Sequence, residues 1–240
     1  MLLENFRVNI YYMSLRKTVI LDNEYYHIYN RGIEKREIFL DEEDYFRFIK
    51  LLYLCNSKKR INFRIDIIEK NIDAWDFDRE DQIVSIGAWV LMPNHFHLYI
   101  TGSRSLASGK NNDINIITFL QKLSTAYAKY FNAKYNRTGS LFEGKFKSVH
   151  IENDNQAKYL FSYIHLNPIK LIQKNWKEEG IKDKNKALEF LDNYRWSSYC
   201  EYLEFNRKEK AILNRENFLD YFISKEVFKK EIFEWISIAT

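Results

Sequence analysis

The stretch Ala88-Trp89-Val90-Leu91-Met92-Pro93-Asn94-His95-Phe96-His97-Leu98-Tyr99-Ile100 contains an apolar strand, a break at Pro93-Asn94 and a second strand with a His-x-His pattern. Successive side chains of a strand point to opposite faces, so His95 and His97 share one face and the apolar residues between and after them share the other. Two imidazoles side by side on a rigid strand are candidate ligands for one divalent metal ion. The alternative is two half-buried histidines with ordinary hydrogen-bond partners, and the pair by itself does not decide between them.

The composition is that of a globular chain with one basic segment. Of the 240 residues, 46% are hydrophobic and 29% are charged, and the net charge is only +4. Residues 103–150 hold eight basic and two acidic side chains, a net +6 that leaves −2 for the rest of the chain. A basic surface of this kind suits a phosphate backbone, although a solvated helix face is the commoner reason for a charge run.

Cysteine usage and hydropathy indicate the compartment. Cys55 and Cys200 form neither a disulfide framework nor a Cys-rich zinc site, which fits a reducing cytoplasm. No apolar run approaches the ~18 residues of a membrane span, and Glu4 and Arg7 interrupt any signal-peptide pattern. We expect a cytoplasmic, nucleoid-associated protein of bacterial type with no membrane partner.

Hydrophobic periodicity predicts alternating strands and helices. Asp41 and Asn153 or Asp154 have the character of helix N-caps. The expected strands cover about 24–31, 83–91 and 95–100, and an extended basic-aromatic segment covers 141–149. The expected helices cover about 41–54, 113–135 and 153–166, the last stopped by Pro168.

Two regions fit this pattern less well. Residues 61–67 alternate cleanly between apolar and polar and predict a strand within a possible insertion at 56–81. Residues 101–112 are rich in Gly, Ser and Asn and predict a loop. We divide the chain into an N-terminal extension (1–17), a main domain (18–200) and a C-terminal helical extension (201–240).

Three blocks together resemble a known family. They are Met92-Pro93-Asn94-His95-Phe96-His97-Leu98, Arg137-Thr138-Gly139-Ser140-Leu141-Phe142-Glu143-Gly144-Lys145-Phe146-Lys147-Ser148 and Tyr163-Ile164-His165-Leu166-Asn167-Pro168. In this order and spacing they resemble the single-tyrosine HUH transposases, and most closely the REP-associated tyrosine transposase branch. The resemblance covers about residues 18–200.

The resemblance implies an α+β fold, ferredoxin-like, with an antiparallel sheet and helices on one face. It also implies DNA transposition by an endonuclease and strand transferase that acts on single-stranded or hairpin DNA through a covalent 5′-phosphotyrosine intermediate. By motif match, Tyr163 is the catalytic nucleophile, and His95, His97 and Asn167 are the metal ligands.

The residues make chemical sense without the family. A tyrosine can attack phosphorus and keep the 5′ phosphate as an ester, so that a strand can be rejoined later. Three protein ligands leave open positions for phosphate and water on a metal ion. The hard oxygens of phosphate favour Mg²⁺ or Mn²⁺ as the cofactor, although His and Asn ligands also bind zinc or copper well.

Each assignment has an ordinary structural alternative. Tyr163 could be a helix tyrosine packed on the core, and Asn167 could be a helix C-cap. Tyr159 is the rival nucleophile, one turn earlier on the same helix face. His165 should face elsewhere, and His27 and His150 are expected to be structural.

Basic side chains are assigned to DNA contacts, mainly from the resemblance; they are Arg31, Lys129, Arg137, Lys145 and Lys147. The segment 137–147 interleaves them with Phe142 and Phe146, a combination that can clamp a backbone and stack bases. Two alternative functions stay open. One is a module of the same fold that binds DNA or RNA and has lost catalysis, and the other is a metal-dependent nuclease that uses water. Both a monomer and a homodimer stay open.

Overall fold

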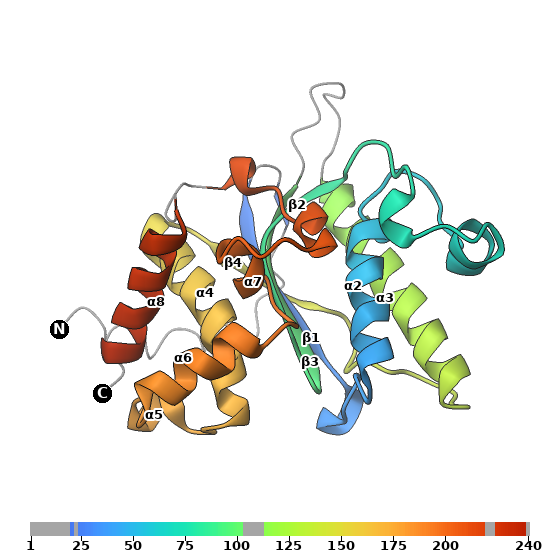
Figure 1. Cartoon of the computed structure of the whole chain (residues 1–240). Helices are drawn as coiled ribbons and strands as arrows, with labels where there is room; N and C mark the ends of the chain where they lie inside the picture. The colour runs from blue at the N-terminus through green and yellow to red at the C-terminus, as the bar shows by residue number, and fades with distance from the viewer. Residues whose placement is uncertain (1–19, 22–23, 103–112, 219–223, 239–240) are drawn as a thin grey trace.

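The computed structural model describes residues 20–21, 24–102, 113–218 and 224–238 (Figure 1). A four-stranded antiparallel sheet lies at its centre, with the strands in the order β2-β3-β1-β4. These strands are β1 (Tyr25–Arg31), β2 (Val84–Met92), β3 (His95–Gly102) and β4 (Lys147–Ile151).

Two long helices alternate with these strands along the chain. Helix α2 (Glu42–Cys55) lies between β1 and β2, and α3 (Asp113–Lys134) lies between β3 and β4. The chain order β1-α2-β2-β3-α3-β4 with this strand order is the ferredoxin-like arrangement. The predicted α+β class with an antiparallel sheet is therefore confirmed.

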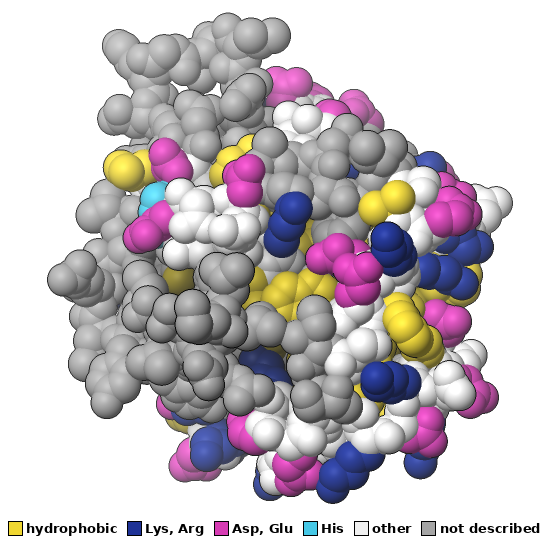
Figure 2. Space-filling model, turned by 90° about the vertical axis from the view of Figure 1, so that its left-hand side faces the viewer, with side chains coloured by type: hydrophobic (Ala, Val, Ile, Leu, Met, Phe, Trp, Pro, Cys, Tyr) yellow, Lys and Arg dark blue, Asp and Glu magenta, His cyan; other side chains and the backbone are white. Residues whose placement is uncertain are grey.

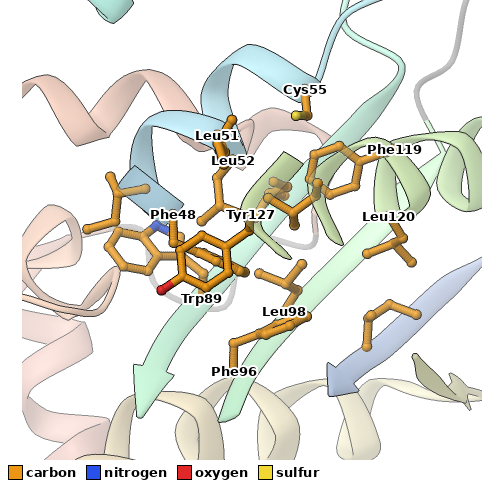
Figure 3. Packing of buried hydrophobic residues seen from close by; sticks show 14 of the residues in the cluster. Phe48, Leu51, Leu52, Cys55, Trp89, Phe96, Leu98, Phe119, Leu120 and Tyr127 are labelled. Atoms are coloured by element: carbon orange, nitrogen blue, oxygen red, sulfur yellow. The ribbon is translucent and has the colours of Figure 1, made fainter. Parts of the chain in front are cut away.

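Helices α2 and α3 cover one face of the sheet and enclose a core rich in aromatic rings (Figure 3). Phe48 of α2 packs against Phe96 of β3 and Tyr127 of α3, with ring centroids 5.0 and 4.9 Å apart. Phe96 and Leu98 are fully buried here. The face opposite the His pair is thus the core face that the alternation in the sequence predicts.

Helices also cover the other face of the sheet, so the expectation of helices on one face is wrong, because the strands carry a second set of buried side chains. This face is covered by α4 (Asp154–Leu166) and by segments that follow it (Figure 1). These segments are η5 (Asn167–Leu171), α5 (Trp176–Glu179), α6 (Lys184–Asn193), α7 (Tyr199–Tyr202) and α8 (Lys225–Ile238). They pack on the strand side chains that point to this face, among them Ala88, Val90 and Tyr99. Figure 2 shows the side on which α8 lies, where positive and negative side chains are intermixed.

The prediction of a strand at 61–67 is wrong, because the chain forms the short π-helical segment η3 (Arg64–Glu69) there. The side chain of Asn62 accepts a hydrogen bond from the Arg64 amide at 3.1 Å and so begins the helical turn. The free edge of β2 is occupied by residues 196–198, which bond to it through Leu91 N and Trp89 O. A strand at 61–67 would have no partner at that edge.

The short 3-10 helices in the rest of the chain are η2 (Ile33–Lys35), η4 (Ala74–Asp76), η6 (Lys208–Ile212) and η7 (Arg215–Asn217). Of the predicted loop at 101–112, residues 101–102 belong instead to β3, and residues 103–112 lie outside the described residues, as does the predicted extension at 1–17. The insertion and the domain boundaries stay predictions. In the part of the chain that the structure describes, every helix is too short or too polar to cross a membrane.

Both predicted N-caps are present. Asp41 accepts a hydrogen bond from the Asp44 amide at 3.0 Å, and Asn153 accepts one from the Gln156 amide at 3.0 Å. These bonds satisfy amides that the first turn of a helix leaves without an intrahelical partner. The second cap sets where α4 begins and hence which of its residues face the sheet.

A buried polar cluster joins α2 to α3 through Asp44. The Asp44 carboxylate is fully buried and accepts hydrogen bonds from Lys134 Nζ at 3.0 Å and from the hydroxyls of Tyr130 and Tyr135 at 3.0 and 2.7 Å. It also accepts one from the Leu40 amide at 2.8 Å. A buried charge is stable only when it is paired and hydrogen-bonded in this way.

We predict that Asp44→Ala lowers the free energy of unfolding by about 3 kcal/mol, because three half-buried side-chain donors lose the fully buried acceptor that they share. Urea denaturation followed by circular dichroism measures this. The control is Glu234→Ala, which removes an exposed pair with Lys230 at 3.8 Å and should change stability little. Equal stabilities of the two variants would contradict the prediction.

Candidate active site

The His-x-His residues lie on β3, just after the tight turn that joins β2 to β3. Pro93 O accepts hydrogen bonds from the amides of Ile38 and Phe39 at 2.8 and 3.1 Å, and Asn94 O accepts one from Gly32 N at 2.9 Å. The turn is thus fixed to the segment that follows β1. In the register, His95 lies opposite Arg31, and His97 lies opposite Tyr29.

The two imidazoles lie close together, with ring centroids 5.0 Å apart and planes at 88°. Each uses Nδ1 in a hydrogen bond: His95 Nδ1 lies 2.5 Å from Asn94 Oδ1, and His97 Nδ1 lies 2.8 Å from His27 Nε2. The Nε2 atom of His97 is buried and has no hydrogen-bond partner. That atom is therefore available as a ligand.

Burial controls the charge of both rings. It lowers the pKa of His95 to about 4, and the charges of Lys170 and Arg31 act in the same direction. It also lowers the pKa of His97 well below its ordinary value, with the neighbouring His27 and His95 adding to the effect. Both rings are neutral near pH 7, which is the form of imidazole that binds metals.

Helix α4 carries Tyr163 and Asn167 to the same place. The Tyr163 ring lies 5.4 Å from the His97 ring and 6.2 Å from the His27 ring, edge-on in each case. Asn167 is the C-cap of α4 and is fully buried beside the His95 side chain. The α-helix ends at Leu166 before Pro168, as predicted, and the chain continues as the 3-10 helix η5.

The donor set at this place fits a divalent metal ion. Besides His97 Nε2, both polar atoms of the Asn167 amide are buried without a hydrogen-bond partner. The described residues contain no group of three or more His, Cys, Asp or Glu side chains arranged to hold a metal. The candidate ligands at this site are therefore two imidazoles and one amide. Such a three-ligand site leaves positions open for substrate oxygens.

Two lysines flank the tyrosine, and sequence reasoning missed both. Lys177 Nζ lies 3.7 Å from the centre of the Tyr163 ring, and Lys170 Nζ lies 5.6 Å from it. Burial, together with the Lys170 charge, lowers the pKa of Lys177 to about 7. Lys177 belongs to the four-residue helix α5, and nothing in its local sequence marks it.

The rival tyrosine, Tyr159, lies one turn back on α4. Its ring is parallel to that of Tyr163 at 6.2 Å and packs edge-on against Trp235 of α8 at 5.5 Å. Helix α8 therefore packs against α4 next to Tyr159. Of the two tyrosines, Tyr163 is the one whose ring is in edge contact with His97.

The remaining histidines have other surroundings. His165 is fully buried on the far side of α4, with Nε2 2.8 Å from Ser198 Oγ. His150 lies on β4 opposite Tyr26, on the face covered by α2 and α3, with Nε2 2.8 Å from Glu24. His27 lies opposite Tyr99, on the face of the His pair.

The predicted DNA-contact residues fall into two groups. Lys147 of β4 lies opposite Tyr29 of β1, on the same face as His97. Arg31 lies opposite His95 and forms an ion pair with Glu143. Lys145 is exposed just before β4. Lys129 and Arg137 belong to α3 and the turn after it, on the opposite face of the sheet, and Arg137 lies 5.6 Å from the Phe131 ring. The structure therefore places Arg31 and Lys147 on the face of the His pair and Lys129 and Arg137 on the other side of the sheet.

The sequence matches no family model and no curated protein. Among solved structures, the chain is similar to a REP-associated tyrosine transposase bound to a REP hairpin, with 12% identity, a TM-score of 0.46, and coverage of 80% of this chain and 86% of that one. It is also similar to a protein from Deinococcus radiodurans proposed to be a transposase, with 14% identity, a TM-score of 0.30, and coverage of 60% and 90%. A bacterial tRNA-His guanylyltransferase-like protein in complex with ATP follows, with 10% identity, a TM-score of 0.37, and coverage of 82% and 78%. Because every TM-score is below 0.5, these likenesses carry no argument about function.

The buried His165 gives a prediction for the dependence of stability on pH. Burial lowers its pKa to about 3, with the Arg215 charge acting in the same direction, whereas the unfolded chain has a His pKa near 6.5. Between these values the unfolded state binds a proton that the folded state does not, so stability falls as pH falls.

We predict that His165→Gln makes the pH dependence of the unfolding free energy shallower by up to about 1.4 kcal/mol per pH unit between pH 6 and pH 4. Urea titrations at several pH values measure this slope for both proteins. An unchanged slope in the variant would show that His165 does not bind its proton on unfolding.

Proposed function

We propose that this protein is a metal-dependent enzyme that nicks and rejoins single-stranded DNA through a covalent tyrosine intermediate, and that its target is a DNA hairpin, as in DNA transposition. The observation that carries the proposal is the meeting of Tyr163 with the His pair, at 5.4 Å between the rings of Tyr163 and His97. The order of the three sequence blocks that resemble single-tyrosine HUH transposases supports the same activity.

In the proposed step, Tyr163 Oη attacks the phosphorus of a phosphodiester and forms an ester with the 5′ phosphate. The bond to the 3′ oxygen breaks, the phenol proton passes to solvent, and the 3′ oxygen leaves as a hydroxyl after it takes up a proton. The ester keeps the energy of the broken bond. A second 3′ hydroxyl can therefore attack it and rejoin the strand without ATP.

Charge near the tyrosine favours this step. A phenol of ordinary pKa near 10 costs ~4 kcal/mol to ionise at pH 7. The amines of Lys170 and Lys177 lie beside the ring, and positive charge at that place stabilises both a phenolate and a phosphate. A divalent ion such as Mg²⁺ or Mn²⁺, held by His95, His97 and Asn167, would bind the charge that develops on the non-bridging oxygens.

One chain supplies all four of these residues. Tyr163 and Asn167 come from the end of α4, and the His pair comes from β3 of the same chain. We therefore propose that the tyrosine acts on DNA held by its own chain. A homodimer is compatible with this but is not required to complete the site.

The nucleophile is tested on a denaturing gel with a pool of labelled single-stranded DNA hairpins with varied flanks, in the presence of Mn²⁺. We predict a labelled band at the mass of the protein for the wild type and for Tyr159→Phe, and no band for Tyr163→Phe. Tyr159→Phe is the matched control because it removes the same hydroxyl from the neighbouring turn of α4.

Three results would contradict the proposal. Persistence of the band in Tyr163→Phe with its loss in Tyr159→Phe would make Tyr159 the nucleophile. Cleavage without an adduct would indicate a nuclease that uses water. Binding without cleavage, across the pool and with each metal, would indicate a DNA-binding module without catalysis.

A second experiment tests the DNA-binding face. We predict that Lys147→Ala weakens single-stranded DNA binding and lowers the slope of log affinity against log salt by about 0.7, because one phosphate contact is lost. Lys129→Ala removes the same charge from the opposite face of the sheet and should leave the slope unchanged. Fluorescence anisotropy with a labelled oligonucleotide at several salt concentrations measures both. Equal effects of the two variants would place the contact elsewhere.

A further inference from the structure

His27 makes a contact that the proposed chemistry does not use. Its Nε2 atom lies 2.8 Å from His97 Nδ1, and the two rings are stacked with centroids 5.0 Å apart and planes at 26°. Both side chains are buried, with 8% and 6% exposed. In the register, His27 lies opposite Tyr99 and Tyr29 lies opposite His97, so His27 reaches His97 along the diagonal of the strand pair.

A hydrogen bond between two neutral imidazoles has two forms, since each ring has one N–H and one lone pair. If His97 donates, its Nε2 carries a lone pair and can bind a metal. If His97 accepts, its Nε2 carries the proton and cannot. Because Nε2 is buried and has no acceptor nearby, the second form would leave an N–H group without a partner, which costs free energy.

The other histidine of the pair, His95, is held with its proton on Nδ1 by a different residue, Asn94. His95 Nδ1 lies 2.5 Å from Asn94 Oδ1, which can only accept, so His95 carries its proton on Nδ1. The orientation of the Asn94 amide is fixed because its Nδ2 donates to Lys35 O at 3.1 Å. Both rings would then present Nε2, which is what two ligands of one ion need.

We propose that His27 is a positioning residue, whose Nε2 accepts a hydrogen bond from His97 Nδ1 and so holds His97 in the tautomer and orientation that leave its Nε2 free to ligate a metal ion. This inference rests on the metal site of the proposed function. The strand pairing keeps His27 in place, and its ring stacks on Tyr29 with centroids 4.9 Å apart. Residues that orient a metal-binding histidine in this way commonly affect metal affinity 10–100-fold.

The first readout uses neither metal nor DNA. Long-range ¹H–¹⁵N correlation spectra of the protein with ¹⁵N-labelled histidine report which nitrogen of each ring is protonated, and the chain has only five histidines. We expect His97 to be protonated at Nδ1 in the wild type and in His27→Gln, whose amide oxygen can still accept. In His27→Leu we expect a mixture of tautomers or the Nε2–H form.

The second readout is the affinity for Mn²⁺, measured by calorimetry without DNA. We expect His27→Leu to bind about 10–100-fold more weakly than the wild type, and His27→Gln to recover most of the loss. The matched control is His150→Leu, which removes a histidine from the opposite face of the sheet and should not change the affinity. Thermal melts of each variant check that it is folded.

The inference is overturned if His97 carries its proton on Nε2 in the wild type, or if His27→Leu changes neither the tautomer nor the affinity. The wild-type spectrum decides this even if His27→Leu does not fold. If the wild type binds no Mn²⁺, the metal site of the proposed function is wrong, and the tautomer spectrum still decides whether His27 fixes His97. Failure of the proposed metal site and failure of the proposed role of His27 therefore give different results.

Discussion

The antiparallel pairing of β1 with β3 is the constraint on which the candidate site depends. Directly opposite residues share a face, so His97 lies against Tyr29 and His95 lies against Arg31. A shift of this register by one residue would send both histidines into the core and bring Phe96 to the site. The packing of Phe96 against Phe48 opposes such a shift, because the aromatic core accepts only one register.

The second constraint is the packing of α4 against the face that bears the His pair. Ile164 and Leu160 of this helix are buried in the same cluster as Val90 and Tyr99, and this packing turns Tyr163 and Asn167 toward the histidines. The result is a buried group of polar atoms without partners, which includes His97 Nε2 and both atoms of the Asn167 amide. Such atoms cost stability, and they are expected where a fold is built to receive a ligand.

Electrostatics at the site depend on burial more than on net charge. The chain as a whole is only +4, yet Lys177 and Lys170 stand beside one tyrosine, and burial lowers the pKa of Lys177 to about 7. The same burial keeps His95 and His97 neutral. Neutral imidazoles therefore lie next to two lysine amines, so none of these groups carries a negative charge that would repel an anion.

Local pattern was sufficient for the strands β1, β2 and β3, for the helices α2, α3 and α4, and for the two faces of β3. Alternation in β3 separated His97 from Phe96, the N-caps Asp41 and Asn153 marked where α2 and α4 begin, and the spacing of Tyr163 and Asn167 put them on one side of a helix. These features depend on interactions within a few residues, which a sequence contains directly. The strand predicted at 61–67 failed because alternation cannot tell whether a partner edge is free, and residues 196–198 occupy that edge. Only the tertiary structure brought His27 to His97 and Lys177 to Tyr163, since contacts between distant segments depend on strand order and helix packing.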